Sequence, residues 1–278
     1  MPDSRPLITR RDDGFPRIMG VINITPDSFF EDSRSNNLSE TIKIASLMID
    51  NGAEWLDIGG ESTRPGATPV GVEEEISRVI PVIKELREKF PNVGISIDTR
   101  RAKVAELALK EGVHMVNDVS ALGDVEMLDV IKQSNCYICL MHMKGIPENM
   151  QNNPLYEDVI IEVKEMLNEK VKLLIDEGVN AERIIVDPGI GFGKSLEHNL
   201  SLLKSGRNIV PNDKIGLMWG VSRKSMFSEL LGRAEPNDRL AGTLGIASIS
   251  RLKGVDIIRV HDVAEHADMF RAISALED

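Results

Sequence analysis

The feature that most constrains this chain is a repeated alternation of short apolar segments with longer segments of helical periodicity. The short segments are rich in Ile and Val and run without polar alternation, which indicates strands covered on both faces, as in a parallel sheet flanked by helices. We predict eight such strands: Arg17–Asn23, Trp55–Gly59, Gly94–Asp98, His114–Asp118, Tyr137–Met141, Arg183–Asp187, Lys214–Trp219 and Asp256–Val260.

Apolar residues at helical spacing occupy most of the sequence between these strands. The stretch after Asp187 is the least regular, and the pattern does not define where its helix begins. The predicted helices are Leu38–Asn51, Val72–Lys89, Ala102–Lys110, Asp124–Lys132, Tyr156–Glu177, Arg239–Lys253 and Val263–Leu276.

Eight strand–helix units in 278 residues favour a single (β/α)₈ barrel domain, because such barrels typically fill about 250 residues. A doubly wound open sheet is the alternative, since the number of strands does not show closure. We predict that residues 14–278 form the barrel. Residues 1–13 are polar and contain two prolines, and we expect a loosely held leader or a short strand pair covering the barrel bottom.

Charge and composition exclude several classes of partner. Lys and Arg number 33 against 44 Asp and Glu, a net charge of −11, which argues against a general nucleic-acid-binding surface. No apolar stretch approaches the roughly 18 residues that span a membrane, and no apolar signal segment follows Met1, so we expect a cytoplasmic protein. Cys136 and Cys139 lie three apart in the apolar run that contains the predicted strand Tyr137–Met141, on opposite faces if the run is extended, and are expected to be buried structural thiols.

Nearly every predicted strand ends on a polar or ionisable residue. Catalytic groups of parallel barrels stand at the C-terminal ends of the strands. Helix capping explains a single Asp or Asn after a strand, but not eight polar strand ends on one rim. The residues are Asn23, Glu61–Arg64, Asp98, Asn117, Asp118, His142, Asp187, Ser222–Lys224, Arg259 and His261.

These rim residues fall into groups with different chemistry. Asn23 offers an oxygen to a hard cation beside a phosphate. A cationic patch in an otherwise acidic chain suits phosphate or diphosphate oxygens and consists of Arg64, Lys224, Arg259 and His261. Paired acceptors and donors for a nitrogen-rich heterocycle come from Asp98, Asn117 and Asp187. The rim therefore predicts a phosphorylated, nitrogen-rich small substrate.

Other motifs do not support a known site. Gly193-Lys194-Ser195 ends like a phosphate-binding P-loop, but Pro188 stands where that motif requires glycine. The spacing of Gly189, Gly191 and Gly193 is not the dinucleotide fingerprint, so we expect these glycines to let a tight loop pass close to a ligand. Zinc-enzyme spacing is absent among the histidines, and structural or solvated positions are predicted for His114, His198 and His266.

Eight segments, in order along nearly the whole chain, resemble those of the dihydropteroate synthase family. Together they are highly specific. They are Met19-Gly-Val-Ile-Asn-Ile-Thr-Pro-Asp-Ser-Phe29, Gly59-Gly-Glu-Ser-Thr-Arg-Pro-Gly66, Ser96-Ile-Asp-Thr99, Asn117-Asp118, Leu140-Met-His-Met143, Asp187-Pro-Gly-Ile-Gly-Phe-Gly-Lys194, Ser222-Arg-Lys-Ser225 and Arg259-Val-His-Asp-Val263.

The resemblance implies a homodimeric, Mg²⁺-using (β/α)₈ enzyme of folate biosynthesis. It implies condensation of 6-hydroxymethyl-7,8-dihydropterin diphosphate with 4-aminobenzoate, giving 7,8-dihydropteroate and diphosphate. The implied pterin site comprises Asp98, Asn117, Val119, Met141, Asp187, Lys224 and Arg259. The implied diphosphate site comprises Asn23 (also the Mg²⁺ ligand), Thr63, Arg64, Arg259 and His261. The implied aminobenzoate site comprises Pro65, Phe192, Ser222 and Lys224, and the catalytic set Arg64, Asp98, Lys224, Arg259 and His261.

Two local features bear on these implied roles. Ser222 precedes a helix-forming stretch, and free N–H groups there would bind the aminobenzoate carboxylate. The first loop reads Phe30-Glu-Asp-Ser33 where the family usually has Ser-Asp-Gly-Gly, and we expect Glu31 or Asp32 to order that loop when it closes. Two alternatives share the fold: a pterin-binding methyltransferase, which binds no diphosphate, and a non-catalytic pterin-binding paralogue.

Overall fold

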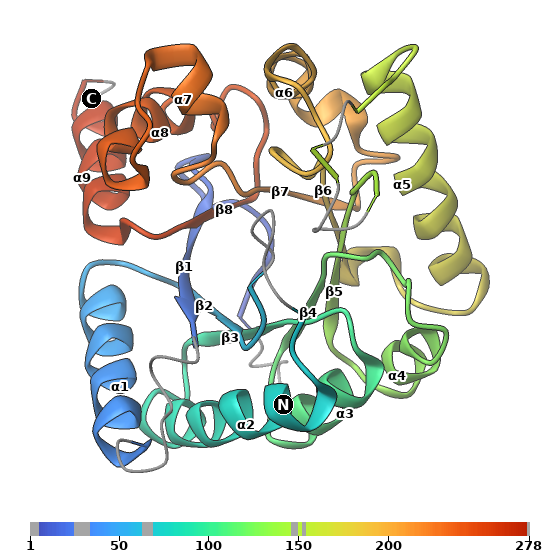
Figure 1. The fold of residues 1–278 in the computed structure, drawn as a ribbon, viewed down its shortest axis with the longest axis vertical. Coiled ribbons are helices and arrows are strands. Elements are labelled where there is room, and N and C mark those ends of the chain that lie inside the picture. The colour runs from blue at the N-terminus through green and yellow to red at the C-terminus, as the bar shows by residue number, and fades with distance from the viewer. Residues whose placement is uncertain (1–5, 25–33, 63–68, 146–149, 152–153, 277–278) are drawn as a thin grey trace.

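The chain folds into a closed barrel of parallel strands. In the computed structural model, the described residues form eight strands in chain order with helices around the outside (Figure 1). The first strand pairs with both the second and the last, which closes the sheet. The (β/α)₈ prediction is therefore confirmed, and the open-sheet alternative is wrong. The structure describes residues 6–24, 34–62, 69–145, 150–151 and 154–276. For residues 34–37 it describes only the backbone.

All eight predicted strands are present. Four have the predicted bounds, and the other four begin one or two residues later than predicted. The strands are β1 Arg17–Asn23, β2 Trp55–Gly59, β3 Gly94–Asp98, β4 Met115–Asp118, β5 Tyr137–Met141, β6 Ile184–Asp187, β7 Gly216–Trp219 and β8 Ile257–Val260.

The helices cover the outer face of the barrel. Those described are α1 Arg34–Asp50, α2 Val72–Lys89, α3 Ala102–Lys110, α4 Met127–Gln133, α5 Val159–Asp176, α6 Leu196–Ser205, α7 Met226–Leu231, α8 Leu240–Ala247 and α9 Val263–Ser274. Short 3₁₀ turns lie at Ala181–Arg183, Gly206–Ile209 and Pro236–Arg239.

Helix caps explain where the structure and the predicted bounds differ. α5 begins three residues later than predicted because the Asp158 carboxylate accepts hydrogen bonds from the backbone N–H groups of Ile160 and Ile161. The undefined helix after Asp187 begins behind Ser195, whose side chain and that of His198 cap each other's backbone N–H. α8 is shorter than predicted, ending at Ala247 before a run of turns.

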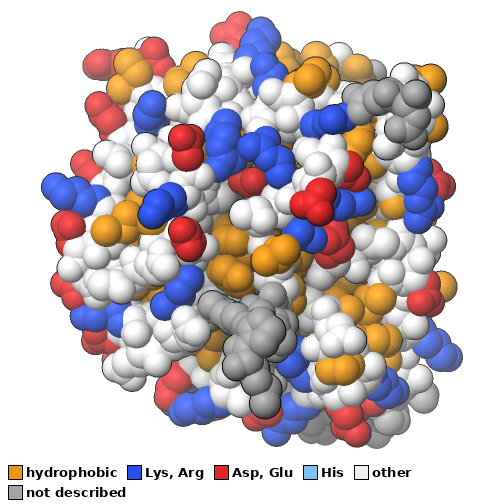
Figure 2. All heavy atoms as spheres, turned by 180° about the vertical axis from the view of Figure 1, so that it is seen from behind, with side chains coloured by type: hydrophobic (Ala, Val, Ile, Leu, Met, Phe, Trp, Pro, Cys, Tyr) orange, Lys and Arg blue, Asp and Glu red, His pale blue; other side chains and the backbone are white. Residues whose placement is uncertain are grey.

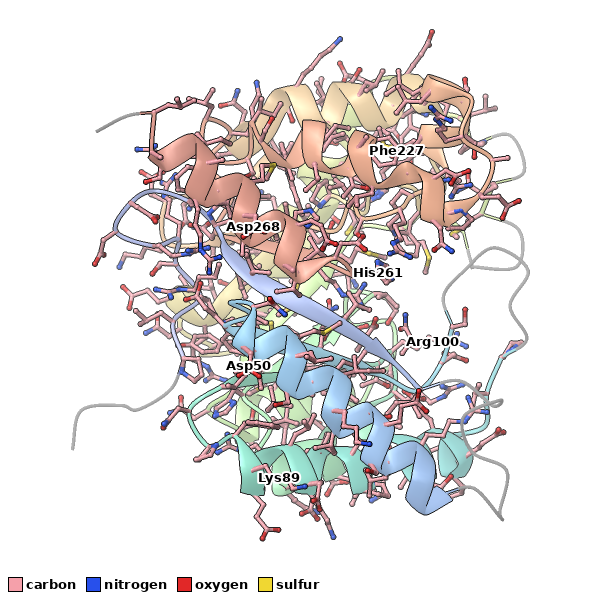
Figure 3. The ribbon with its side chains drawn as sticks, turned by 90° about the vertical axis from the view of Figure 1, so that its left-hand side faces the viewer. Asp50, Lys89, Arg100, Phe227, His261 and Asp268 are labelled. Atoms are coloured by element: carbon pink, nitrogen blue, oxygen red, sulfur yellow. The ribbon has the colours of Figure 1, made fainter. Side chains whose placement is uncertain are left out.

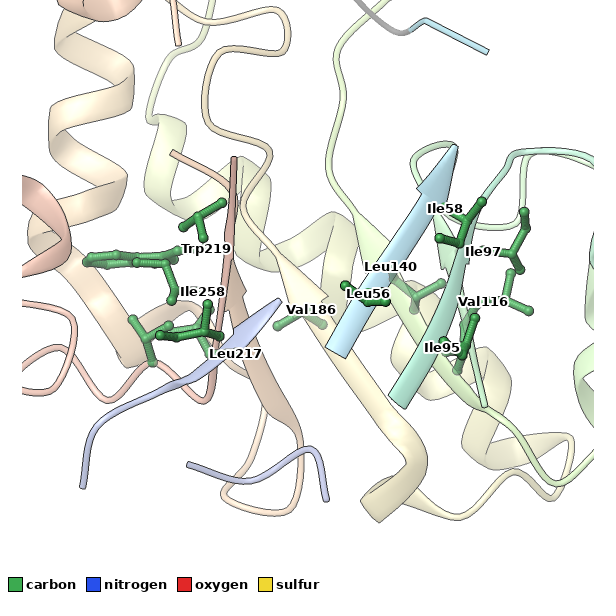
Figure 4. Close-up of a cluster of buried hydrophobic side chains, with 14 of the residues drawn as sticks. Leu56, Ile58, Ile95, Ile97, Val116, Leu140, Val186, Leu217, Trp219 and Ile258 are labelled. Carbon is green, nitrogen blue, oxygen red and sulfur yellow. The ribbon is translucent and has the colours of Figure 1, made fainter. Parts of the chain in front are cut away.

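Alternating strand residues point to the outside and the inside of the barrel. The outward residues pack against the helices in one large cluster, part of which Figure 4 shows, including Leu56, Ile95 and Ile258. The inward residues near the N-terminal ends of the strands form a second cluster. That cluster comprises Ile8, Met19, Trp55, Met115, Tyr137, Cys139, Ile185, Met218 and Ile257.

The two cysteines follow this alternation. Cys136 packs in the outer cluster and Cys139 in the inner one, so the prediction of buried structural thiols on opposite faces is confirmed. The described part of the leader covers the barrel bottom, where Ile8 is 5% exposed and the Leu7 carbonyl accepts a hydrogen bond from Trp55 Nε1 at 3.0 Å. Residues 6–13 contain no strand, so the strand-pair alternative is wrong for that part.

Charged side chains are spread over the surface. On the face opposite to that of Figure 1, Lys and Arg side chains are interspersed with Asp and Glu, and hydrophobic side chains gather near the middle (Figure 2). Among the helices of the described residues, none combines the length and the apolar character needed to cross a membrane.

Candidate active site

Five polar side chains share the inward direction of the apolar inner cluster but lie nearer the C-terminal ends of the strands. Four of them follow an inner-cluster residue by two positions, as Asn117 follows Met115 on β4, and Asp98 follows Ser96 in the same way. All but Arg259 are under 9% exposed. They are Asp57, Asp98, Asn117, Asp187 and Arg259. In Figure 3, β1 points to the side of the barrel where His261 and Arg100 lie.

Arg259 joins three of these strands. Its Nε donates to Asp57 Oδ2 at 2.6 Å, and its terminal nitrogen donates to Asp98 Oδ2 at 2.7 Å. Asn117 Nδ2 donates to the same Asp57 oxygen at 3.1 Å. Asp57 Oδ1 is buried with no hydrogen-bond partner among the described residues. The guanidinium is thus held in place by two carboxylates, one from β2 and one from β3.

Burial determines the charge states at this end of the barrel. It raises the pKa of Asp98 to about 7; Arg259 opposes this shift, and the nearby Asp57 carboxylate adds to it. Burial alone would lower the pKa of Arg259, but Asp57 and Asp98 outweigh it and raise the pKa. Arg259 therefore stays cationic, while Asp98 titrates near neutral pH.

Asp187 and Lys224 form a second polar pair. Burial raises the pKa of Asp187, although the Gly189 N–H, which donates to its Oδ1 at 2.7 Å, and the Lys224 charge oppose that shift. Burial lowers the pKa of Lys224 to about 8, Arg259 lowers it further, and Asp187 and Asp98 raise it. At neutral pH, Lys224 is cationic, and the charges of Asp187 and Asp98 stabilise that form.

An apolar wall lies beside these polar groups. Val119, Met141, Met150 and Phe192 form a separate buried cluster, with Met143 packed against it. Lys224 Nζ sits over the Phe192 ring, 3.9 Å from its centroid, a cation–π arrangement. The structure thus brings together four side chains that the resemblance implied would surround two aromatic substrates: Val119, Met141, Phe192 and Lys224.

The loop between β6 and α6, residues 188–195, passes close to the loop that follows β5. Gly189 has φ +66° and Gly193 has φ +62°, and a Cβ at either would overlap a carbonyl oxygen, of His142 and Lys144 respectively. At these two positions the glycines allow close approach of a neighbouring loop, a role that the sequence did not predict.

The Ser222 side chain is already hydrogen-bonded to His261. Its Oγ accepts from the His261 backbone N–H at 3.1 Å and lies 3.0 Å from His261 Nδ1. Burial lowers the pKa of His261 to about 4, with Arg259 and Arg223 lowering it further, so the imidazole is neutral at pH 7 and does not belong to the cationic patch. A Ser222 hydroxyl that donates to Nδ1 leaves the proton on Nε2, which is then free to donate.

The prediction of free backbone N–H groups after Ser222 is also corrected. α7 begins only at Met226. The Arg223 N–H donates to Thr243 Oγ1 at 3.1 Å, and the Lys224 N–H donates to the Val221 carbonyl at 3.4 Å. These two groups are therefore engaged within the protein.

A charged network at the ends of β2 and β3 was not predicted. Glu61 accepts from Arg100 Nε at 3.0 Å, from Arg101 at 3.1 Å and from the Val70 N–H at 2.9 Å. Arg101 also pairs with the buried Glu75. The Arg100 and Val70 hydrogen bonds and the Arg101 charge lower the pKa of Glu61 against the effect of burial. The network ties residues on both sides of the 63–68 segment to β3.

Several predicted site residues lie outside the described residues: Glu31, Asp32, Thr63, Arg64 and Pro65. Asn23 ends β1 with an exposed side chain whose Oδ1 lies near the glycine at the end of β2. The described part of the chain contains no group of three or more His, Cys, Asp or Glu side chains that could hold a metal ion.

Three of the other histidines, His114, His198 and His266, are structural, as predicted. His114 Nδ1 accepts the Ile95 N–H at 3.1 Å, and His198 caps α6. His266 is fully buried and contacts the Asp262 carbonyl at 2.6 Å. His142 lies buried behind the β6–α6 loop, 2.9 Å from Lys194 Nζ.

Asp57 and Lys194 are the buried site residues that sequence reasoning missed. Asp57 lies in the middle of β2 and not at its end, where site residues of a parallel barrel are expected. Its sequence signal is a charged residue inside an apolar strand, in phase with the inward Trp55 and Gly59. Lys194 ends a failed phosphate-binding motif and one of the eight family segments, but no role was predicted for it, although it closes a loop that follows a rim carboxylate.

Comparisons with known proteins agree with this geometry. The model of the pterin binding enzyme family matches residues 19–261. The dihydropteroate synthase of Escherichia coli (strain K12) is 42% identical over 267 residues, covering 96% of this chain and 94% of the relative.

Two solved structures are similar to this chain over nearly their whole length. The Yersinia pestis dihydropteroate synthase in complex with a sulfonamide drug has a TM-score of 0.88 and 37% identity, covering 96% of both chains. The Burkholderia cenocepacia dihydropteroate synthase complexed with 7,8-dihydropteroate has a TM-score of 0.85 and 38% identity, covering 94% of this chain and 91% of that one. The chain therefore belongs to the pterin-binding enzyme family and, within it, to the dihydropteroate synthases, transferases of folate biosynthesis.

Proposed function

We propose that the C-terminal end of this barrel condenses 6-hydroxymethyl-7,8-dihydropterin diphosphate with 4-aminobenzoate. One observation carries the proposal: Asp98, Asn117 and Asp187 face the same interior space as Arg259, with Lys224 and Phe192 beside them. Acceptors for a nitrogen-rich ring, cations for a diphosphate and an aromatic wall are thus gathered at one end of the barrel. The solved relative that holds 7,8-dihydropteroate supports the same reaction.

The pterin ring would bind deepest, against Asp187 and Asn117. Asp187 is 4% exposed and Asn117 3% exposed, so their hydrogen bonds to the ring would form in a site with little water. Met141 and Val119 would cover the faces of the ring. A ring nitrogen that binds a buried carboxylate in this way is held directionally, because both partners lose water and must pair.

The diphosphate would lie closer to the rim. Arg259 would bind it with the part of its guanidinium not engaged by Asp57 and Asp98, and His261 would donate from Nε2. We include Thr63 and Arg64 in this site on the strength of the family motif. Asn23, as a carboxamide oxygen donor, would hold Mg²⁺, which usually takes one or two protein ligands and completes its shell with phosphates and water.

Aminobenzoate would pack between Phe192 and the Lys224 stem, with Pro65 also assigned to this site by the motif. Because Ser222 is bonded to His261, we revise its role: it sets the imidazole tautomer, and the carboxylate lies beyond it, toward solvent. The relative solved with a sulfonamide drug supports an arylamine site in this fold.

The reaction breaks the bond between the pterin methylene carbon and the diphosphate oxygen and forms a bond from that carbon to the aniline nitrogen. The diphosphate leaves with the electron pair, and the aniline loses a proton. Arg259 and the His261 N–H stabilise the leaving group, while Asp98 and Asp187 stabilise positive charge that spreads into the pterin. Bound Mg²⁺ would neutralise further charge on the diphosphate. An aromatic amine is a weak base and is neutral at pH 7, so no strong general base is required.

Dimerisation is part of the proposal. α8 is apolar at almost every position, yet of its eight residues the buried ones are Thr243 and Ala247. A helix that is apolar all round is normally covered on all sides, and a second copy of the chain would cover it here. Gly245 lies on this helix with open space around it, so Gly245→Glu adds a charge without a clash in the single chain. We expect the wild type to elute as a dimer and the variant as a monomer in size-exclusion chromatography with light scattering.

We further propose a cytoplasmic location. Cys136 and Cys139 are unpaired and buried, as is usual in a reducing compartment.

Diphosphate release tests the function. The full chain is mixed with Mg²⁺, dihydropterin diphosphate and 4-aminobenzoate, and each component is omitted in turn. We expect release that requires all three. Tight pterin binding by calorimetry without any release would instead assign the chain to the non-catalytic alternative. Transfer of a methyl group to a corrinoid protein would assign it to the methyltransferases.

A further inference from the structure

Lys194 closes the β6–α6 loop with a buried side chain that no step of the proposed reaction uses. The residue is 3% exposed. Its Nζ lies 2.9 Å from the Phe192 carbonyl, 3.0 Å from the Gly189 carbonyl and 3.3 Å from the His142 carbonyl. Its remaining close partner is His142 Nδ1 at 2.9 Å. Within the described residues, these partners of Nζ are neutral carbonyls and an imidazole, and none is a carboxylate.

The loop needs these donors because its carbonyls point inward. A buried carbonyl without a donor is costly. Elsewhere in the loop, Tyr156 Oη donates to the Gly193 carbonyl at 2.9 Å, and Gln151 Nε2 donates to the Gly191 carbonyl at 2.6 Å. Lys194 Nζ donates to the carbonyls of Gly189 and Phe192, and the Gly189 carbonyl also accepts the Phe192 N–H at 3.1 Å. Lys194 therefore holds the two positions between which the loop turns.

Those two positions lead directly to groups of the proposed site. The Gly189 N–H donates to Asp187, the proposed pterin carboxylate. Phe192 presents its ring to Lys224 at the proposed aminobenzoate site. Asp187 is also fixed by β6, whereas Phe192 lies in the middle of the loop, with glycine on both sides. Loss of the Lys194 side chain is therefore expected to displace Phe192 more than Asp187.

We propose that Lys194 is a positioning residue for the arylamine, which fixes the loop through the Phe192 and Gly189 carbonyls so that the Phe192 ring forms one wall of the aminobenzoate site. Lys194 touches neither substrate. The inference rests on the proposed function and extends it to the residue that shapes the second substrate's site.

The charge state of Lys194 is compatible with this role. Burial lowers the pKa of Lys194 to about 7; Lys224 and Lys144 lower it further, and Asp187 raises it. Burial, together with the charge of Lys194, lowers the pKa of His142 to about 3, so the imidazole facing Lys194 is neutral. A neutral Lys194 amine keeps two N–H donors for the Gly189 and Phe192 carbonyls, while His142 Nδ1 changes from acceptor to donor. The arylamine effect should thus be similar at pH 6 and pH 8.

The test replaces Lys194 in the full chain by Met, which has a similar stem and no donor. In steady-state diphosphate release we expect the KM for 4-aminobenzoate to rise about tenfold, because displacing a positioning group by about 1 Å costs that much or more. The KM for dihydropterin diphosphate should stay within twofold. Lys132→Met is the matched control, because Lys132 is an exposed lysine of α4 that pairs with Glu177 and contacts no described residue of the β6–α6 loop; both of its KM values should be unchanged.

A purely structural role predicts a different result and would overturn the proposal: kcat falls with the folded fraction, and both KM values stay constant. If Lys194→Met does not fold, Lys194→Gln keeps two donors on a shorter stem. We then expect a smaller rise, confined to the aminobenzoate KM, and equal changes in both KM values would count against the proposal.

Hydrogen–deuterium exchange gives a readout that does not depend on catalysis. In Lys194→Met the amides of Gly191 and Phe192 should exchange at least tenfold faster, while those of the barrel strands stay unchanged. Faster exchange with an unaltered aminobenzoate KM would confirm that Lys194 holds the loop but refute its effect on the arylamine. Unaltered exchange would refute both. A wild type that releases no diphosphate would refute the proposed function alone, since the exchange experiment would still test Lys194.

Discussion

The two ends of the barrel interior use the same strands for opposite purposes. On β4, Met115 and Asn117 point inward two residues apart, and on β6 the same holds for Ile185 and Asp187. The first member of each pair belongs to an apolar cluster that excludes water. The second is a buried polar group near the C-terminal ends of the strands. Strand geometry supplies both positions equally, so the choice of side chain decides whether an inward position stabilises the fold or serves the site.

The electrostatics of the two ends differ accordingly. The inner cluster at the bottom consists of Ile, Met, Trp, Tyr and Cys side chains, and the charged residues near it, Arg17, Glu54, Arg207 and Asp256, are joined in ion pairs. At the other end, burial raises the pKa of Asp98 to about 7 and lowers the pKa of Lys224 to about 8, so the surroundings disfavour the ionised form of each group. Such opposed shifts cluster at functional sites. We infer that the polar end is kept for function at a cost in stability, which the apolar end offsets.

The largest effect is expected from Asp187→Ala at the polar end. The change leaves the donors of the pterin ring unpaired in a buried site. We expect kcat/KM for dihydropterin diphosphate to fall about a thousandfold, or about 4 kcal/mol. The melting temperature should stay the same or rise, because a buried carboxylate with a raised pKa is removed. A variant that kept its affinity for pterin in calorimetry would show that Asp187 has a different role.

Met115→Ala makes the opposite test at the apolar end. Met115 is fully buried in the inner cluster, and truncation of such a side chain to Ala costs about 3 kcal/mol of unfolding free energy. Urea denaturation should show that loss, while kcat/KM per folded molecule stays within twofold. An equally large fall in kcat/KM would mean that the two ends are mechanically coupled and that the contrast between them is overstated.

The sequence predicts the apolar end better than the polar end. Short apolar runs between helical segments mark the strands, so their bounds were predicted to within two residues, although which strand residues face inward was not predicted. Strand-end positions gave Asp98, Asn117 and Asp187, because parallel strands bring their C-terminal ends together. Pairings between side chains far apart in the chain could not be predicted. Asp57 and Arg259 lie 202 residues apart, and only closure of the barrel joins them.

Contacts between loops could not be predicted from the sequence either. The engagement of Ser222 with His261 depends on how the loop after β7 meets the end of β8. In the sequence alone, where that contact is not visible, a serine before a helix-forming stretch indicates an anion-binding site. The glycines of the β6–α6 loop were recognised as a tight turn, but the sequence does not show that the loop after β5 is the neighbour that requires them.

Asp57→Asn should sharpen the comparison with a smaller effect. The amide keeps an oxygen for Arg259 and Asn117 but removes the charge that raises the pKa of Arg259. We expect kcat/KM for dihydropterin diphosphate to fall about tenfold, or about 1.4 kcal/mol, through a less firmly held guanidinium. The KM for 4-aminobenzoate should change less than twofold. If Asp57→Asn matched Asp187→Ala in severity, Asp57 would itself contact the substrate.

The smallest effect is expected from raising the pH, which should change the activity and the stability that depend on Lys224 in opposite directions. Lys224 has a pKa of about 8, so its cationic form is lost as the pH rises above that value. If that charge binds substrate, kcat/KM for dihydropterin diphosphate should fall up to tenfold by pH 9, and Lys224→Arg should move this decline to higher pH.

The contribution of Lys224 to the free energy of unfolding should change in the opposite direction. Between about pH 8 and the ordinary lysine value of about 10.5, the unfolded chain binds more protons than the folded one, so this group makes the free energy of unfolding rise with pH. Urea denaturation of the wild type and of Lys224→Met across that range isolates the contribution. A wild type that lost stability relative to Lys224→Met above pH 8 would contradict the lowered pKa, and with it the view that the polar end of the barrel is maintained against the stability of the fold.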